Sequence, residues 1–239
     1  AVRRLLATVD AEILVMADAD TTYDATAAPR MISHLQHEHL DMVTGVRVMM
    51  DKTAYRRGHI WGNRLFNRLF GSLFKTQTQD VFSGYRVLTG RFARALPVQA
   101  TGFEIEAEMS AVAAVLKLSV GEVPVEYYAR PIGSKSKLST YRDGFRILCT
   151  YVRLLRHFHP KRFFGFWSAL TALASLGWGL PVVLEFFNTG LVPRFPTAIL
   201  ASSLGLISVM ILVTGLLLEA IARNRIEQRQ LMMLIKKGS

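Results

Sequence analysis

The sequence is poor in cysteine and in acidic residues. Its single cysteine, Cys149, excludes both an internal disulfide framework and a zinc site built from several cysteines. The 18 Asp and Glu are outnumbered by 29 Lys and Arg, which gives a formal net charge of +11. This excess indicates an anionic partner: nucleic acid, a phosphorylated ligand or anionic lipid. The hydrophobic share of 51% excludes a disordered chain, because such chains combine low hydrophobicity with high net charge.

The beginning of the sequence lacks an initiating Met, an early strand and a glycine-rich phosphate loop. Residues 1–9 resemble the end of a helix that leads into the first strand. An α/β sheet that begins here would lack its first units. We therefore expect the chain to be an N-terminally truncated fragment of a longer protein.

Charged side chains are absent from two long segments near the C-terminus. Residues 163–184 and 197–218 each contain 22 residues without a single charge. As helices they would each span about 33 Å, which matches the thickness of a bilayer core. A short connector joins them, so we expect a transmembrane hairpin in contact with a lipid bilayer. Two buried helices of a soluble domain are the alternative, but such helices rarely lack a polar face.

Basic residues flank the two expected spans and are almost absent from the connector, which carries only Arg194. The positive-inside rule therefore places both ends of the chain in the cytosol. This predicts a multi-pass protein of the inner or plasma membrane. The flanking residues are Lys161 and Arg162 before the first span, and Arg223, Arg225, Arg229, Lys236 and Lys237 after the second.

The remaining 160 residues alternate between strand and helix patterns. This alternation predicts an α/β domain with a mostly parallel or mixed sheet. Strands are expected at 12–17, 41–48, 85–88 and 118–128, and helices at 26–38, 57–75 and 104–116.

The segment 140–158 has apolar residues at helical spacing with arginines between them. This pattern predicts an amphipathic helix on an anionic membrane surface. The alternative is a helix that packs on the core of the soluble domain. Nucleic-acid binding is excluded, because the basic residues cluster near the spans and no nucleic-acid-binding module is recognisable.

Two carboxylates, Asp18 and Asp20, follow the first expected strand directly. Ligands of α/β sheets bind beyond the carboxyl ends of the strands, where these side chains stand. Carboxylate oxygens suit Mg²⁺ or Mn²⁺ that bridges to a diphosphate. The alternative is an acidic turn that only caps the next helix.

Three further motifs combine charged, hydroxyl and glycine residues. Asp80–Arg86 (DVFSGYR) brings an acid, a serine, a glycine and an arginine together within seven residues. Gly102–Glu108 has acids at alternate positions where a helix begins, and Arg130–Leu138 is a basic loop rich in glycine and serine. The loop suits a grip on phosphate, although a solvated turn is the alternative.

The order of the motifs resembles that of one known family. The motifs are DADTTYD, TGVR, YRRGH, DVFSGYR, GFEIEAEM and ARPIGSKSKL, and two spans and a basic tail follow them. That family is the group of family-two glycosyltransferases that attach a sugar to a polyprenyl phosphate. They include enzymes like dolichyl-phosphate mannose synthase and bacterial relatives acting on undecaprenyl phosphate. The resemblance covers essentially the whole chain. It implies a GT-A fold, which is a Rossmann-like α/β sandwich. It also implies sugar transfer from a nucleotide-sugar to a lipid phosphate at the cytosolic membrane face.

The resemblance assigns roles to individual residues. Asp18 and Asp20 match the motif that holds a divalent cation, Mg²⁺ or Mn²⁺, on the donor diphosphate. Asp80 matches the catalytic acid near the acceptor, although an ionised lipid phosphate hardly requires a strong base. The loop over the donor diphosphate would use Arg130, Ser134, Lys135 and Lys137. The acceptor phosphate would be held by Arg47, Arg56, Arg57 and Arg86, whose guanidinium groups suit its geometry.

The catalytic role has a second candidate in the glutamates of 102–108. Glu104 and Glu106 could face the active site, as the base does in many enzymes of this family. Alternatively, Glu104 and Glu108 form one solvated helix face and Glu106 lies on another side. We prefer Asp80.

These expectations define four regions and leave other functions open. Besides sugar transfer, the alternatives are an inactive membrane-anchored scaffold and a polysaccharide synthase, although the synthase motif Gln-x-x-Arg-Trp is absent. Whether the protein is a homo-oligomer stays open. The regions are a partial GT-A catalytic domain at 1–139, an interfacial helix at 140–162, two transmembrane helices within 163–222 (163–186 and 197–218), and a basic cytosolic tail at 223–239.

Overall fold

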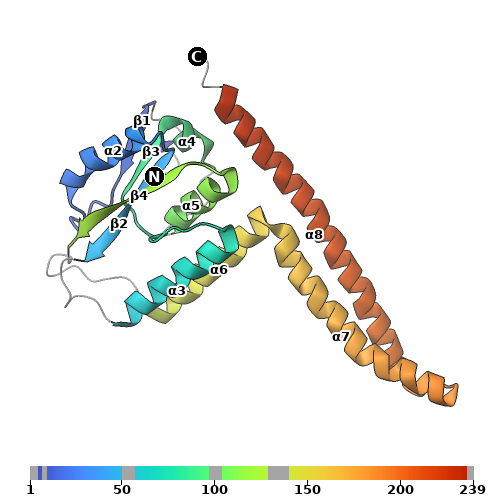
Figure 1. Cartoon of the computed structure of the whole chain (residues 1–239). Helices are drawn as coiled ribbons and strands as arrows, with labels where there is room; N and C mark the ends of the chain where they lie inside the picture. The colour runs from blue at the N-terminus through green and yellow to red at the C-terminus, as the bar shows by residue number, and fades with distance from the viewer. Residues whose placement is uncertain (1–4, 7–9, 50–56, 97–103, 129–139, 236–239) are drawn as a thin grey trace. The chain divides into compact units, whose positions relative to one another are not determined.

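The structure is a computed structural model that describes residues 5–6, 10–49, 57–96, 104–128 and 140–235 (Figure 1). The chain divides into two compact units. One consists of Ala1–Tyr151 together with Ile226–Ser239, and the other is Val152–Arg225.

The helices and strands lie close to the segments that the sequence predicts. Within the described residues, only the short elements η1 and α4 were not expected. α4 begins with Gly90, and glycine is a poor helix former. The helix is stabilised by Thr89, which caps it by accepting a hydrogen bond from the backbone N–H of Phe92 at 3.2 Å. The strands are β1 (Ile13–Met16), β2 (Met42–Met49), β3 (Arg86–Thr89) and β4 (Val120–Tyr127). The helices are η1 (Ala25–Ala27), α2 (Ala28–His37), α3 (Arg57–Phe74), α4 (Gly90–Ala95), α5 (Glu104–Leu116), α6 (Thr140–Phe158), α7 (Pro160–Thr189) and α8 (Phe195–Ile235).

The strands form one mixed sheet with the order β1-β3-β2-β4. β3 runs antiparallel to both of its neighbours, β1 and β2. β2 and β4 are parallel, with Met42 opposite Val120 at one end and Met49 opposite Tyr127 at the other. Of the two sheet types expected, the structure therefore has the mixed one.

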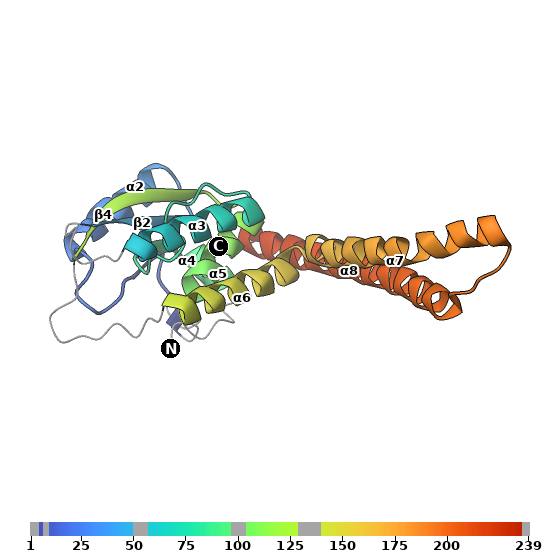
Figure 2. The same cartoon turned by 90° about the horizontal axis from the view of Figure 1, so that it is seen from below.

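The sheet is covered on both faces, with α2 on one side and α5 on the other (Figures 1 and 2). Met31 and Leu35 of α2 belong to a buried cluster with Val43, Val87 and Val125 of the sheet. Neighbouring strand residues point to the opposite face, because side chains alternate along a strand. This two-faced burial explains the apolar strands and confirms the expected α/β class.

The helices α3 and α6 pack together through aromatic side chains. The Tyr151 hydroxyl donates to the Phe66 carbonyl at 3.2 Å, and the Tyr151 ring lies 5.6 Å from that of Phe70. Other apolar side chains of α6 are exposed, with Phe145 at 69% and Leu148 at 45%. One side of α6 therefore packs on α3, as the core-facing alternative expects, and the other side carries exposed apolar side chains. Contact of that exposed side with a membrane stays a prediction.

The second unit contains all of α7 and most of α8, and both helices are long and apolar enough to cross a membrane. Their most apolar windows have mean hydropathies of 1.6 and 2.4. Serines join the two helices: the hydroxyls of Ser168 and Ser208 each donate to the other residue's carbonyl, at 2.9 and 3.0 Å. Ser175 donates to the Ala201 carbonyl at 2.7 Å. Lipid offers no hydrogen-bond partners to polar groups, so contacts of this kind satisfy the serine hydroxyls within the hairpin itself.

Both of these helices extend beyond the uncharged segments. α7 continues to Thr189, and α8 remains helical as far as Ile235. The segment expected as a basic tail is therefore mostly helical. Gln230 donates to the Leu116 carbonyl of α5 at 3.3 Å, in agreement with its place in the first unit.

Candidate active site

The acidic segment after β1 is shaped by its own side chains. Asp20 accepts hydrogen bonds from the Thr22 backbone N–H at 3.3 Å and from the Thr22 hydroxyl at 2.5 Å. Thr21 has a φ of 58°, which is rare for a β-branched residue. A backbone conformation of this kind costs on the order of 1–3 kcal/mol and is often found at functional sites.

The alternative of a helix cap applies to another residue of this segment. Asp24 caps η1 by accepting a hydrogen bond from the Thr26 backbone N–H at 2.9 Å. Its bonds to Thr26 lower the pKa of the Asp24 carboxyl. Because Asp24 fulfils the capping role, that role does not explain Asp18 and Asp20.

Asp18 brings this segment into contact with the motif at 80–86. A Cβ atom on Gly84 would lie only 2.5 Å from Asp18 Oδ2 and 2.9 Å from Asp18 Oδ1. The carboxylate can come this close only because residue 84 has no side chain. Two motifs more than sixty residues apart in the sequence therefore meet at one place.

Asp80 forms a two-pronged ion pair with Arg47 of β2. Arg47 Nε donates to Asp80 Oδ2 at 2.7 Å, and Arg47 Nη2 donates to Asp80 Oδ1 at 2.8 Å. The Asp80 residue is only 4% exposed, while the Arg47 side chain keeps 18% of its surface accessible. The guanidinium also lies over the ring of Tyr127, 5.5 Å from its centroid. This pairing fixes the direction of both side chains.

The loop that carries Asp80 is held on both sides by residues that the sequence analysis missed. The Asn67 side chain donates to the Gln79 carbonyl at 2.5 Å and accepts from the Val81 backbone N–H at 3.2 Å. Glu122 accepts from the Gln79 backbone N–H at 2.8 Å, and burial raises the pKa of the Glu122 carboxyl. No local sequence pattern indicates these roles of Asn67 and Glu122, because their partners are distant in the sequence.

Arg86 supports the same loop from the interior. It is fully buried and donates to the carbonyls of Ser83 at 2.9 Å and Val81 at 2.7 Å, and to the Ser110 hydroxyl at 3.0 Å. Burial lowers the pKa of Arg86 to about 10, so the group remains charged at neutral pH. The expectation that Arg86 binds the acceptor phosphate is not supported by this geometry, because its guanidinium is inaccessible and bonded to protein groups.

Glu106 of α5 lies on the side of the helix that faces these charges. Burial raises the pKa of the Glu106 carboxyl, the charges of Arg86 and Arg47 lower it, and that of Asp18 raises it. The alternative that placed Glu108 on a solvated face is wrong, since this residue is only 7% exposed. Of the two glutamates whose side chains the structure describes here, Glu106 is therefore the one close to the charges of the candidate site.

The remaining expected site residues cannot be placed. The side chain of Arg57, at the start of α3, lies outside the described part of the chain. The same holds for the side chain of Glu104 at the start of α5. Arg56 and the whole loop with Arg130, Ser134, Lys135 and Lys137 also lie outside it.

The carboxylates of the acidic segment fit a divalent cation that is shared with a substrate. Within the described ranges, no group of three or more His, Cys, Asp or Glu side chains is arranged to hold a metal ion by itself. Magnesium is commonly bound by one or two carboxylates together with substrate phosphates. Asp18 and Asp20 fit this second arrangement, because both carboxylates come from one short turn.

Comparison with known proteins reveals relatives along most of the chain, although no family model matches it. It is 41% identical over 158 residues to the uncharacterized protein SF2094/S2216 of Shigella flexneri, covering 66% of this chain and 97% of that protein. It is 34% identical over 179 residues to the glycosyltransferase AglJ of Haloferax volcanii, covering 74% of this chain and 59% of AglJ. The chain thus spans less than two thirds of AglJ.

One solved structure is also similar: glucosyl-3-phosphoglycerate synthase from Mycobacterium tuberculosis, in complex with Mn²⁺ and UDP-glucose. The match has a TM-score of 0.47 and 16% identity, and it covers 64% of this chain and 51% of that one. The sequence relatives decide the family. The chain belongs to the same family as SF2094/S2216. Its similarity to AglJ supports the glycosyltransferases as its class of enzyme.

Proposed function

We propose that the protein transfers a sugar from a nucleotide-sugar to a polyprenyl phosphate at the cytosolic face of the membrane, with a divalent cation on the donor diphosphate. The observation that carries the proposal is the close approach of Asp18 to Gly84. It joins the carboxylates after β1 to the loop of Asp80. The similarity to AglJ supports sugar transfer as the reaction class.

The donor side of the site is the turn after β1. Asp18 and Asp20 would hold Mg²⁺ or Mn²⁺ together with the diphosphate oxygens. When bound, the cation neutralises charge that develops on the departing nucleoside diphosphate. The basic loop with Arg130, Ser134, Lys135 and Lys137 would close over the same diphosphate.

The acceptor side is the ion pair of Asp80 with Arg47. An oxygen of the acceptor phosphate would attack the anomeric carbon of the sugar as the bond from that carbon to the diphosphate breaks. This oxygen is already ionised at neutral pH, so no proton has to be removed. Asp80 would therefore orient Arg47 and the reacting groups, and the accessible edge of Arg47 would bind the phosphate.

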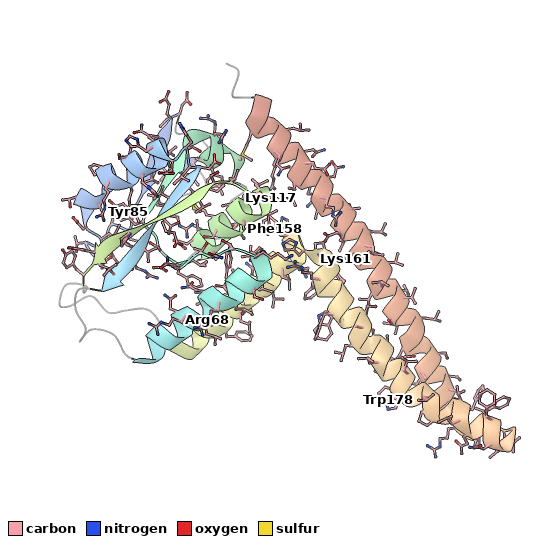
Figure 3. All side chains as sticks on the ribbon, viewed as in Figure 1. Arg68, Tyr85, Lys117, Phe158, Lys161 and Trp178 are labelled. Atoms are coloured by element: carbon pink, nitrogen blue, oxygen red, sulfur yellow. The ribbon has the colours of Figure 1, made fainter. Side chains whose placement is uncertain are left out.

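The membrane features suit a lipid acceptor. α7 and α8 carry exposed apolar side chains along their length, Trp178 among them (Figure 3). The exposed Phe145 and Leu148 of α6 have Arg146 beside them, a combination that suits the headgroup region of an anionic membrane. A polyprenyl phosphate presents its charged end at that level.

A lipid-transfer assay tests the proposed function. Membranes containing the protein would be incubated with undecaprenyl phosphate, Mg²⁺ or Mn²⁺ and a panel of radiolabelled nucleotide-sugars. We expect one donor to give a labelled lipid extractable into organic solvent, and membranes without the protein to give none. Failure with every donor would favour the scaffold alternative. Label found only in polymer would favour a polysaccharide synthase.

The cytosolic location of the site makes a separate prediction about topology. In a Cys149→Ser background, a cysteine introduced by Asn188→Cys should react with a membrane-impermeant thiol reagent on intact cells. A cysteine introduced by Ser239→Cys should react only after permeabilisation, because basic flanks stay in the cytosol. The reverse labelling pattern would place the site away from cytosolic nucleotide-sugars and exclude the proposed reaction.

A further inference from the structure

Tyr23 belongs to the acidic segment after β1 and reaches the motif at 80–86, and none of the roles described above uses it. Its hydroxyl accepts a hydrogen bond from the backbone N–H of Gly84 at 3.0 Å and lies 3.4 Å from the Ser83 hydroxyl. Gly84 is the residue against which the Asp18 carboxylate rests. One side chain of the acidic segment therefore holds the peptide that Asp18 contacts.

The ring of Tyr23 is fixed by two other tyrosines. It packs edge to face against Tyr85 at 5.3 Å and against Tyr127 at 5.0 Å between ring centroids. Its backbone also forms an antiparallel bridge with Tyr127. Tyr127 is the ring beneath the guanidinium of Arg47, which pairs with Asp80. The Tyr23 hydroxyl is thus held on a rigid support, and its direction is set by packing.

The Tyr23 hydroxyl is protonated, which agrees with its contact to the Ser83 hydroxyl. Burial raises the pKa of the Tyr23 hydroxyl, and the charge of Arg47 lowers it to a smaller extent. The group therefore keeps its proton at neutral pH. A neutral hydroxyl can accept from the Gly84 N–H and still offer a proton to the Ser83 oxygen.

We propose that Tyr23 is a positioning residue that sets the distance between Asp18 and the loop carrying Asp80. The inference rests on the proposed function, because those carboxylates serve the donor and the acceptor side of the same transfer. Without the hydroxyl, the buried Gly84 N–H loses its acceptor and the loop can shift relative to Asp18. Misplacement by about 1 Å can cost on the order of a hundredfold in rate.

The variant Tyr23→Phe tests the inference, with Tyr85→Phe as its matched control. Both changes remove one hydroxyl from the same pair of packed rings, but the Tyr85 hydroxyl bonds to the backbone of Ala28 and to the Ala25 carbonyl, the latter at 3.4 Å. Transfer rate, donor affinity by calorimetry, and hydrogen–deuterium exchange of the peptide covering residues 80–86 would be measured. For Tyr23→Phe we expect kcat about tenfold lower, donor affinity within about twofold of wild type, and faster exchange near Gly84. Tyr85→Phe should change none of these.

Each deviation has a distinct meaning. Unchanged kcat in Tyr23→Phe overturns the inference, even where exchange becomes faster, because the contact would then be structural only. Equal losses in Tyr85→Phe overturn it as well, since general ring packing would explain them. If the wild type transfers no sugar at all, the proposed function fails. The exchange measurement then still decides whether Tyr23 holds the loop: faster exchange confined to Tyr23→Phe supports that link, and unchanged exchange excludes it.

Discussion

Asp18→Asn and Asp20→Asn should each lower sugar transfer by at least about a hundredfold while the protein remains folded. Each change replaces a charged ligand of the expected cation by a neutral one of the same shape. Asn at position 20 can still accept the hydrogen bonds from Thr22 that shape the turn, so its effect should be on chemistry. Transfer would be measured over a range of Mg²⁺ and Mn²⁺ concentrations, with the melting temperature as the check on folding.

The matched control is Asp10→Asn, which makes the same chemical change at a fully exposed carboxylate that pairs with Arg94. It should transfer sugar at the wild-type rate. The wild type should also lose activity in EDTA and regain it when Mn²⁺ is added. Full activity of either variant, or of the wild type in EDTA, would remove the cation from the mechanism.

Local patterns were enough to predict all the longer helices and the strands, but not the short η1 and α4. The helical spacing at 104–116 and the apolar run at 41–48 each produced the expected structure, because these signals depend only on neighbouring residues. Strand direction depends on distant partners. Met42 of β2 lies opposite Leu88 of antiparallel β3 on one side and Val120 of parallel β4 on the other. The sequence around residue 42 gives no indication of which neighbour is parallel and which is antiparallel.

The residues of the candidate site also fall into two groups: those with a local sequence signal, and those whose contacts depend on distant partners. Asp18 and Asp80 were predicted as site residues because each stands in a recognisable motif. Asn67 was missed, because its two contacts to the Asp80 loop exist only once α3 lies beside that loop. The central fact about this region, the contact of Asp18 with Gly84, joins two motifs that the sequence presents separately.

Arg86 shows how a motif can suggest the wrong environment for one of its residues. An arginine at the end of DVFSGYR resembled a phosphate ligand, and composition gives no indication that it is fully buried. The alternation of strand residues did contain a signal. Residues 86 and 88 share one face of β3, and Leu88 is also fully buried, so Arg86 points into the same layer. Its charge is accommodated there by the carbonyls of the loop that it holds.

Asp80→Asn should lower the transfer rate by about a hundredfold and change donor affinity by less than about threefold. The amide can accept a hydrogen bond from Arg47 but no longer balances its charge, so the direction of the guanidinium is lost. The donor diphosphate is gripped elsewhere, at Asp18 and Asp20 in our proposal, which is why binding should survive. Transfer kinetics and calorimetry with the nucleotide-sugar separate the two effects.

Asp41→Asn is the matched control for the loss of a buried ion pair. Asp41 is 5% exposed and pairs with Arg91, away from the candidate site. Both variants should be less stable by about 1–3 kcal/mol, since each weakens a buried charged contact. Only Asp80→Asn should lose turnover per folded molecule. Equal loss of donor binding and turnover would move Asp80 to the donor side, and unchanged turnover would leave Glu106 as the better candidate for the catalytic carboxylate.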